Sequence, residues 1–350
     1  MKRVEVLILM LLVACSCLAQ DSYRFRIVSY NVENLFDYQH DSLKNDHEFL
    51  PDATRHWDRQ KYQKKLDDLG RVIIATGEWT PPALVGLCEV ENEHCLTDLT
   101  KHSVLKEAGY RYIMTSSPDQ RGIDVALLYQ REVFKPVSIH TYRVPPLTKQ
   151  KNATRDILHV TGELPNRSLL DVFVCHLPSR SGGEKESEPY RLLAAGVLKQ
   201  AVDSLLQDRK KAQIVIMGDF NDYFDNRSVS EVVGAQPVTK LKADKQQLYH
   251  LLAAKEKALK DYGSYRYHGK WNSLDHLIVN GRLLRQKGSF HILPSDDAFL
   301  IKADVFRADF LLEDDERFGG KLPLRTYSGM KYKGGYSDHL PIYADFILEY

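Results

Sequence analysis

A short apolar run near the middle of the chain, at residues 213–222, is the feature that most limits the fold. It reads Gln-Ile-Val-Ile-Met-Gly-Asp-Phe-Asn-Asp, and its β-branched residues are typical of a strand buried on both faces. Asp219 is therefore expected where the strand reaches the surface, with Asn221 able to point at the same spot. The alternative is a plain turn, because Gly, Asn and Asp favour turns for purely local reasons.

Several other apolar runs end in the same kind of polar residue, and this favours a site over a turn. Strands are expected at residues 24–30, 83–88, 169–175, 274–279 and 342–347, with a strand-rich stretch at 110–164. Amphipathic helices are expected at residues 57–76, 96–107 and 190–206. Strands that alternate with helices and also cluster together predict an α/β layered domain built on mixed sheets. The polar segment 287–332 has little periodicity, and the sequence does not place it.

Composition limits the class of protein and the kind of partner. A chain of 350 residues can bury a substantial core, and 43% hydrophobic with 27% charged residues is an ordinary globular composition. The net charge of +1 excludes a broad polyanion-coating surface, so nucleic acid or phospholipid must be met by a local basic site. Cys88, Cys95 and Cys175 form no CxxC pair and no zinc spacing. We interpret them as core residues, while a disulfide stays open.

The N-terminus has the pattern of an export signal. A basic start precedes an apolar run at residues 6–14 that is too short for a stable membrane anchor. Removal of residues 1–19 would release a soluble protein, which is the reading we prefer. A lipobox-like string ending at Cys15 would instead leave a lipid-modified N-terminus. Residues 24–350 are then expected to form a single domain.

Polar residues stand next to the predicted strands and suggest one chemistry. They are Asn31, Glu89, His176, Asp219, Asn221, Asp275, Asp338 and His339. The sequence contains no nucleophile elbow, P-loop, GxGxxG or HExxH motif. A small set of hard oxygen ligands suits Mg²⁺ or Mn²⁺, whereas zinc would require more His or Cys. An Asp held beside a His suits general-base work on water.

The motifs that carry these residues resemble those of the endonuclease/exonuclease/phosphatase superfamily, which is the DNase I-like group. They lie in the family's order at residues 29–37, 88–91, 121–129, 175–179, 218–222, 273–276 and 337–341. The resemblance implies a four-layer α/β/β/α sandwich of two mixed sheets and metal-dependent hydrolysis of phosphate esters. The Asn-Val-Glu-Asn-Leu-Phe-Asp string looks most like that of secreted bacterial nucleases.

The resemblance also implies which residues lie at the metal. Glu89 matches the principal metal-binding glutamate, while Asn31 and Asp338 match positions near the metal. Many relatives have Gln before this glutamate, where the chain has Cys88. That difference removes one hydrogen-bonding partner and leaves the assignment of Glu89 intact. On its residues alone, Asp338 could equally be a cap or turn acid.

The remaining matches carry the predicted catalytic roles. His339 matches the general base or phosphate-polarising histidine, and Asp275 matches the carboxylate that orients it. Asp219 and Asn221 match the pair that positions the attacking water and steadies the leaving oxygen. His176 matches a histidine that contacts the scissile phosphate, although it could also be an ordinary core or loop histidine.

Charged residues beside the motifs are candidates for substrate binding. They are Arg121, Asp124 and Arg180. Each arginine could bind a substrate phosphate, but lone arginines are commonly solvated surface residues. The unplaced segment 287–332 precedes the predicted Asp338-His339 pair, so it is a candidate substrate-facing loop.

These expectations combine into one predicted function. We predict an exported, monomeric phosphodiesterase that uses Mg²⁺, or Mn²⁺, to hydrolyse nucleic acid by direct attack of water. A phospholipid or sugar phosphate is the alternative substrate on the same fold. A binding module without catalysis is a different class of function, and the full set of catalytic-type residues argues against it.

Overall fold

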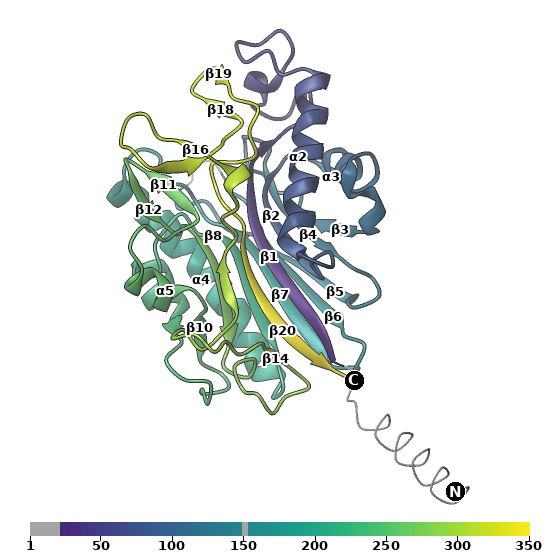
Figure 1. The fold of residues 1–350 in the computed structure, drawn as a ribbon, viewed down its shortest axis with the longest axis vertical. Coiled ribbons are helices and arrows are strands. Elements are labelled where there is room, and N and C mark those ends of the chain that lie inside the picture. Colours follow the sequence, from purple (N-terminus) through teal and green to yellow (C-terminus); the bar gives the residue numbers. More distant parts are fainter. Residues whose placement is uncertain (1–21, 149–152) are drawn as a thin grey trace, which may run out of the picture.

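The computed structural model describes residues 22–148 and 153–350. The predicted export signal at residues 1–19 and the lipobox cysteine Cys15 lie outside the described residues. Two large sheets pack face to face, with helices on their outer faces (Figure 1). This arrangement confirms the predicted four-layer α/β/β/α sandwich of mixed sheets.

The first sheet contains both ends of the described chain. Its strands follow the order β14-β20-β1-β2-β4-β3, and β15 also pairs with β20. Their bounds are β1 (Ser22–Leu35), β2 (Leu84–Val90), β3 (Arg111–Met114), β4 (Asp124–Tyr129), β14 (Phe290–Ile292), β15 (Ala303–Val305) and β20 (Ile342–Glu349). Strands β1 and β2 are parallel, and the other pairs are antiparallel.

The second sheet follows the order β5-β6-β7-β8-β13-β10-β9. Its strands are β5 (Lys135–Tyr142), β6 (Ile157–Glu163), β7 (Leu169–His176), β8 (Ile214–Asp219), β9 (Gln236–Pro237), β10 (Leu248–His250) and β13 (Asp275–Asn280). Strands β7 and β8 are parallel, as are β9 and β10. Both sheets therefore place the carboxyl ends of neighbouring parallel strands along one edge.

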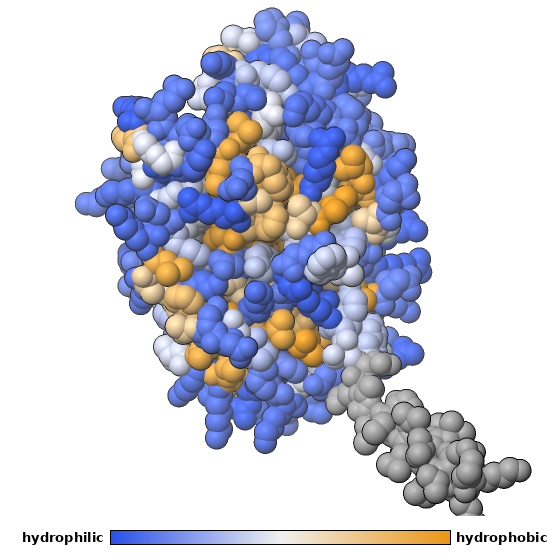
Figure 2. All heavy atoms as spheres, viewed as in Figure 1, coloured by the Kyte–Doolittle hydropathy of each residue, from blue (hydrophilic) through white to orange (hydrophobic). Residues whose placement is uncertain are grey.

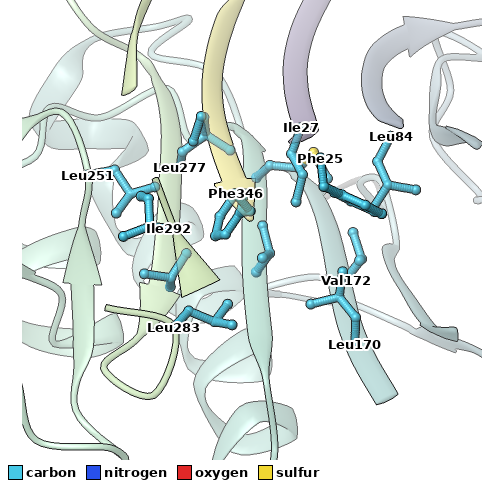
Figure 3. Close-up of a cluster of buried hydrophobic side chains, with 14 of the residues drawn as sticks. Phe25, Ile27, Leu84, Leu170, Val172, Leu251, Leu277, Leu283, Ile292 and Phe346 are labelled. Carbon is cyan, nitrogen blue, oxygen red and sulfur yellow. The ribbon is translucent and has the colours of Figure 1, made fainter. Parts of the chain in front are cut away.

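The packed core lies between the two sheets. Figure 3 shows Phe25 and Ile27 of β1 pointing toward Val172 of β7 and Leu277 of β13, with Phe346 of β20 beside them. All of these side chains are fully buried. Burying one such side chain stabilises the fold by about 1.5–3 kcal/mol. Alternate residues of β1 face the other way, toward the outer helices, because successive strand side chains point to opposite faces.

Helices cover the outer face of each sheet (Figure 1). Helices α2 (Arg59–Gly77) and α3 (Glu93–Lys101) pack on the first sheet, while α4 (Glu184–Asp208) packs on the second. In α2 the buried residues Leu66, Leu69 and Ile73 recur at helical spacing, and Asp58 caps the first turn by accepting a hydrogen bond from the main-chain N–H of Lys61. The apolar stripe of each helix thus fixes the face that it turns to the sheet.

Short elements gather at the end of the molecule opposite the C-terminus (Figure 1). They are the ribbons β11 (Tyr265–Tyr267) with β12 (Lys270–Asn272), β16 (Leu312–Asp314) with β17 (Lys321–Pro323), and β18 (Tyr327–Ser328) with β19 (Lys331–Tyr332). The remaining short helices are η1 (His47–Phe49), η2 (Val104–Ala108), η3 (Ser228–Val233), α5 (Ala253–Ala258) and η4 (Asp309–Leu311). The segment 287–332, which periodicity left unplaced, therefore supplies two strands of the first sheet and two of these ribbons.

The surface is mostly hydrophilic, with separate apolar areas on the face seen in Figure 2. Among the residues that the structure describes, none of the helices combines the length and apolar composition needed to cross a bilayer. The cysteines Cys88, Cys95 and Cys175 are buried and free, which confirms that they are core residues.

Gly218 allows β8 to lie against β7 at the edge where the polar residues meet. Its φ is +135°, and a Cβ atom at this position would lie 1.8 Å from the carbonyl oxygen of Cys175. Only glycine adopts this conformation without strain, and no flexible side chain is available to move aside. The glycine that precedes Asp219 is therefore a packing requirement.

We expect Gly218→Ala to lower the free energy of unfolding by about 3 kcal/mol, because it adds backbone strain and a clash with β7. Urea denaturation of the purified protein measures this change. The matched control is Gly196→Ala in α4, where a Cβ meets open space, so stability should rise by about 0.5–1 kcal/mol. Equal urea midpoints for Gly218→Ala and wild type would contradict this account.

Candidate active site

The predicted site residues converge on one edge of the two sheets. Asn31, Glu89, His176 and Asp219 lie at the carboxyl ends of β1, β2, β7 and β8. Asp275 begins β13, which runs antiparallel to β8 and places it directly opposite Asp219. This register explains why Asp275, unlike the others, stands at the start of its strand.

Asp219 is the centre of this group and is 2% exposed. Its Oδ2 accepts a hydrogen bond from Asn31 Nδ2 at 2.9 Å, and its Oδ1 accepts one from the main-chain N–H of Asn221 at 2.8 Å. The same Oδ2 lies 3.7 Å from His176 Nε2 and 3.9 Å from His339 Nε2. Residues from both sheets thus surround a single carboxylate oxygen.

Burial controls the charge of Asp219. It raises the pKa of this carboxyl to about 7, and the positive charge of His339 partly opposes that rise. A group with a pKa near neutrality can both accept and return a proton at physiological pH. Asp219 is therefore suited to general-base work on water.

His339 and Asp275 form a tight pair beside Asp219. His339 Nδ1 lies 2.7 Å from Asp275 Oδ2, which also accepts a hydrogen bond from Ser264 Oγ at 2.6 Å. Burial by itself lowers the pKa of His339, but the charge and hydrogen bond of Asp275 outweigh it and hold the pKa well above the ordinary value. His339 is consequently positively charged, with its Nε2 turned toward Asp219.

His176 has the opposite electrostatic character. Burial lowers the pKa of this imidazole well below its ordinary value, and the positive charges of Arg155 and Arg121 lower it further. Its Nε2 lies 4.0 Å from Glu89 Oε1. The structure brings His176 to the site as predicted, but as a neutral imidazole. Its predicted contact to the scissile phosphate stays a prediction, and a neutral ring would make that contact by a hydrogen bond and not by charge.

Glu89 lies in a strained turn at the end of β2. Its φ is +69°, in the left-handed region, and the pairing register of β2 with β4 shifts between Cys88 and Val90. Such a bulge redirects a side chain away from the regular alternation of the strand. Glu89 Oε2 accepts a hydrogen bond from the main-chain N–H of Asn34 at 2.9 Å, and its side chain remains 13% exposed. The bulge therefore points a carboxylate into the opening of the site.

Asn31 and Asp338, the other predicted metal neighbours, are held in different ways. Asn31 Oδ1 accepts a hydrogen bond from the main-chain N–H of Glu33 at 3.0 Å. Asp338 Oδ2 accepts one from Arg325 Nη2 at 2.9 Å, and its side chain is 22% exposed. Both residues lie at the site. The Asp338 carboxylate is partly exposed to solvent, whereas the Asn31 amide is buried.

Arg121 reaches the mouth of the site. Its Nη2 donates to Asn34 Oδ1 at 2.6 Å and lies 3.8 Å from Glu89 Oε2. The side chain is 47% exposed, so one side of the guanidinium faces solvent. This position agrees with the predicted contact to a substrate phosphate, which stays a prediction.

One predicted substrate contact, Asp124, needs correction. Asp124 is 4% exposed, and its carboxylate accepts hydrogen bonds from Thr115 Oγ1 at 2.5 Å and the main-chain N–H of Ser117 at 3.1 Å. It secures the loop that carries Arg121 and does not face a substrate. Its nearness to Arg121 in sequence did not show which way its side chain points.

Arg180 makes its hydrogen bonds within the protein, and its predicted contact to a substrate phosphate stays a prediction. Its Nε donates to the carbonyl of Asn221 at 2.7 Å, and its Nη2 donates to Asn226 Oδ1 at 2.7 Å. The guanidinium also lies over the ring of Tyr223, 4.1 Å from the centroid. These contacts hold the turn after β8 in place, and with it Asn221.

An ionic network surrounds Glu33, and no sequence pattern predicted it. Arg325 Nε donates to Glu33 Oε1 at 3.0 Å, and the main-chain N–H of Thr326 donates to Oε2 at 2.7 Å. Lys65 of α2 donates to Thr326 Oγ1 at 2.6 Å. Glu33 stood in a motif without an assigned role, and no pattern marks Arg325. This network brings the segment 287–332 to the edge of the site.

Comparison with known proteins identifies the family. The model of the Endonuclease/Exonuclease/phosphatase family matches residues 26–347, which span nearly all of the described chain. The chain belongs to this family. Its members are metal-dependent phosphoric ester hydrolases, so the protein is an enzyme of that class. No curated protein matches the chain in sequence.

Solved structures share the fold. The human nocturnin catalytic domain with bound sulfate is 17% identical with a TM-score of 0.54, over 93% of this chain and 96% of that one. A mannosyl-6-phosphatase from Bacteroides thetaiotaomicron is 15% identical with a TM-score of 0.55, over 92% and 99%. TDP2 from D. rerio in complex with a single-strand DNA product is 15% identical with a TM-score of 0.52, over 92% and 98%. At these identities the likeness establishes the fold alone.

The side chains present fit the divalent metal on which this family depends. Glu89 and Asp338 place partly exposed carboxylates at the opening, and hard oxygen donors of this kind suit a hard cation. Asp219, Asp275 and His339 also have ligand atoms within 4.8 Å of one another. In that second group, however, His339 Nδ1 is hydrogen-bonded to Asp275 Oδ2, so neither atom is free to bind a metal ion. We therefore interpret it as proton-handling machinery and not as a metal site.

Asp275→Asn should lower the pKa of His339, because it removes the carboxylate that keeps the imidazole charged. Nitrogen-15 NMR of the imidazole ring measures the titration directly. In the wild type the ring should remain protonated at neutral pH, whereas in Asp275→Asn it should be neutral there, since burial then dominates. His276→Gln serves as the control, because burial already lowers the pKa of His276 to about 4. An unchanged His339 titration in Asp275→Asn would refute this assignment.

Proposed function

We propose that the protein is an exported, monomeric phosphodiesterase that uses Mg²⁺ to hydrolyse nucleic acid by direct attack of water. The observation that carries the proposal is the surroundings of Asp219. This buried carboxyl, whose pKa is near 7, lies between the neutral His176 and the charged His339. A proton acceptor and two groups able to bind phosphate oxygens therefore share one small space.

Asp219, His339 and His176 each have a separate role in the hydrolysis. Asp219 takes a proton from water as the water oxygen bonds to phosphorus and the ester P–O bond breaks, and the departing oxygen takes a proton from solvent; Asp219 then releases its proton to solvent. His339, kept charged by Asp275, stabilises negative charge on the phosphate oxygens, and His176 adds a hydrogen bond. A divalent ion held by Glu89 and Asp338 would neutralise further phosphate charge. No serine or cysteine is required as a nucleophile.

The balance of charge favours a diester over a monoester. Arg325 is bound to Glu33 and Asp338, and Arg180 is bound to the turn after β8. Within the described part of the site, Arg121 is the arginine that keeps a half-exposed side chain at the mouth. A phosphate monoester brings two negative charges, whereas a diester brings one. One such arginine beside His339 and the metal suits the singly charged diester.

The substrates named for the similar structures cover both possibilities. One of these structures holds a single-strand DNA product, and another is a mannosyl-6-phosphatase. A sugar phosphate or a phospholipid therefore remains the alternative substrate. The neutral net charge of the chain keeps that alternative open, because nucleic-acid binding usually gains affinity from many phosphate contacts.

A substrate panel tests the proposal on the purified protein. Single-stranded DNA, RNA, sphingomyelin vesicles and mannose 6-phosphate are each incubated with Mg²⁺, with EDTA, and with EDTA followed by excess Mg²⁺ or Mn²⁺. We expect cleavage of nucleic acid that EDTA abolishes and added metal restores. Hydrolysis of only the lipid or the sugar phosphate would reject the nuclease, and inactivity on every substrate would favour a binding module.

Asp219→Asn should reduce kcat by about 10³-fold, because it removes the proton acceptor. Its melting temperature should stay close to that of the wild type, since an amide fills the same space. The matched control is Asp203→Asn on α4, whose carboxylate pairs with Lys199 at the surface and should not affect turnover. Wild-type turnover by Asp219→Asn would remove the central residue from this mechanism.

We also propose export through the N-terminal signal. The basic start and the short apolar run of residues 6–14 support a cut near residue 19. Mass spectrometry of the protein isolated from its host measures the mature N-terminus. We expect it to begin at Gln20. A lipid-modified Cys15 would show the lipoprotein alternative, and an intact Met1 would contradict export by either route.

A further inference from the structure

A line of aromatic rings leads away from the catalytic histidine along β11. The ring of Tyr265 lies 4.8 Å from that of His339 between centroids, and Tyr267 follows at 6.5 Å with its plane only 13° from that of Tyr265. His268 lies 4.1 Å from Tyr267, and Phe318 lies 5.7 Å beyond His268. Tyr265 and Tyr267 lie on β11, and Phe318 lies between β16 and β17; Figure 1 shows both ribbons at the end of the molecule opposite the C-terminus.

The start of this line is fixed to the active site by the backbone. Tyr265 forms a β-bridge with His339, and the main-chain N–H of Leu340 donates to the carbonyl of Ser264 at 2.7 Å. Ser264 Oγ in turn donates to Asp275, the partner of His339. The first ring is thus held in a set position beside the reacting group, as a preorganised binding surface requires.

A pocket of about 620 Å³ opens beside these rings. Its lining includes Tyr223, Tyr265, Tyr267, Leu274, Asn221 and Arg180. Asn221 follows Asp219 by two residues, so the pocket is continuous with the site of attack. Tyr267 is 59% exposed, although a large ring is more stable when it is covered. The position and exposure of the rings indicate that a ligand covers them.

The charges of the pocket do not suit a second phosphate. Arg180, the arginine among the described lining residues, already donates to the carbonyl of Asn221 and to Asn226. Glu184 also lines the pocket and adds a negative charge, so a second phosphate would lack a free cation. Ring faces, in contrast, suit a flat and uncharged group.

We propose that Tyr265 and Tyr267 form a subsite for an unpaired nucleobase of a nucleotide that flanks the scissile phosphate. Every base has a π-face, so stacking on these rings would bind single strands with little sequence preference. A base inside a duplex has its faces covered by its neighbours and cannot enter the pocket. The inference rests on the proposed nuclease function and narrows its substrate to unpaired nucleic acid.

Substrates that differ only in one base test the subsite. The dinucleoside phosphate of two thymidines is compared with two analogues, in each of which one thymine is replaced by hydrogen. In the wild type, loss of the base on one side should lower kcat/KM by about tenfold or more, while loss on the other side should have little effect. Tyr267→Ala should lower kcat/KM for the intact dinucleoside phosphate to the value for the analogue that lacks the stacked base, so that the two compounds no longer differ.

Three further variants separate stacking from general damage. Tyr267→Phe keeps the ring and should keep the difference, whereas Tyr267→Leu keeps much of the bulk without the ring and should lose it. Trp79→Ala removes an aromatic ring that is 93% exposed and outside the pocket, and it should behave like the wild type. Thermal melting confirms that each variant is folded, and Tyr267→Leu carries the test if Tyr267→Ala does not fold.

The outcomes distinguish failure of the subsite from failure of the nuclease. If the wild type hydrolyses all three dinucleoside compounds equally, or if Tyr267→Ala retains the difference, the subsite is rejected while the nuclease stands. If the wild type hydrolyses none of them yet cleaves bis(p-nitrophenyl) phosphate with Mg²⁺, the nuclease is rejected and the subsite falls with it. Hydrolysis of mannose 6-phosphate that depends on Tyr267 would assign the pocket to a sugar instead.

Discussion

The hydrogen bond from Asn31 to Asp219 joins the two sheets at the candidate active site. It spans 2.9 Å between a strand end of the first sheet and one of the second. Asp219 is buried, so the loss of this donor would leave part of its carboxylate unsolvated. The bond requires the two strand ends to lie level, and close packing of Gly86 on Met217 helps to set that position. A Cβ at Gly86 would lie 2.5 Å from Met217 Sδ.

Irregular backbone around this bond aims the remaining side chains. Glu33, Asn34, Glu89 and Asn221 all have positive φ although none of them is glycine. Each such residue costs about 1–3 kcal/mol, and they persist only where the surrounding structure enforces them. Here the packed core and the Glu33 network with Arg325 provide that support. The strain thus lies around the site, where a side chain such as Glu89 turns into the opening instead of following the alternation of a strand.

Local patterns predicted the part of the site that strands deliver. Asp219 follows a buried strand directly, so its place at the sheet edge could be read from neighbouring residues. Arg325 could not be found in this way, because its partner Glu33 is 292 residues distant and its own segment has little periodicity. Asp124 was misplaced because sequence shows a neighbour but not the direction of a buried side chain. The resemblance to a family supplied the predicted roles of the site residues. Their protonation states, such as the neutral state of His176, could be inferred only from the packed structure.

Binding of Mn²⁺, measured by electron paramagnetic resonance, tests most directly whether the carboxylates at this edge of the sandwich build a metal-dependent centre. The wild type should bind Mn²⁺, and Glu89→Gln should weaken that binding by at least about tenfold, because it removes the carboxylate that the bulge of β2 turns into the opening. Glu231→Gln is the matched control, since Glu231 pairs with Arg227 at the surface and should not affect affinity. Equal Mn²⁺ affinity in the wild type and in Glu89→Gln would contradict this account.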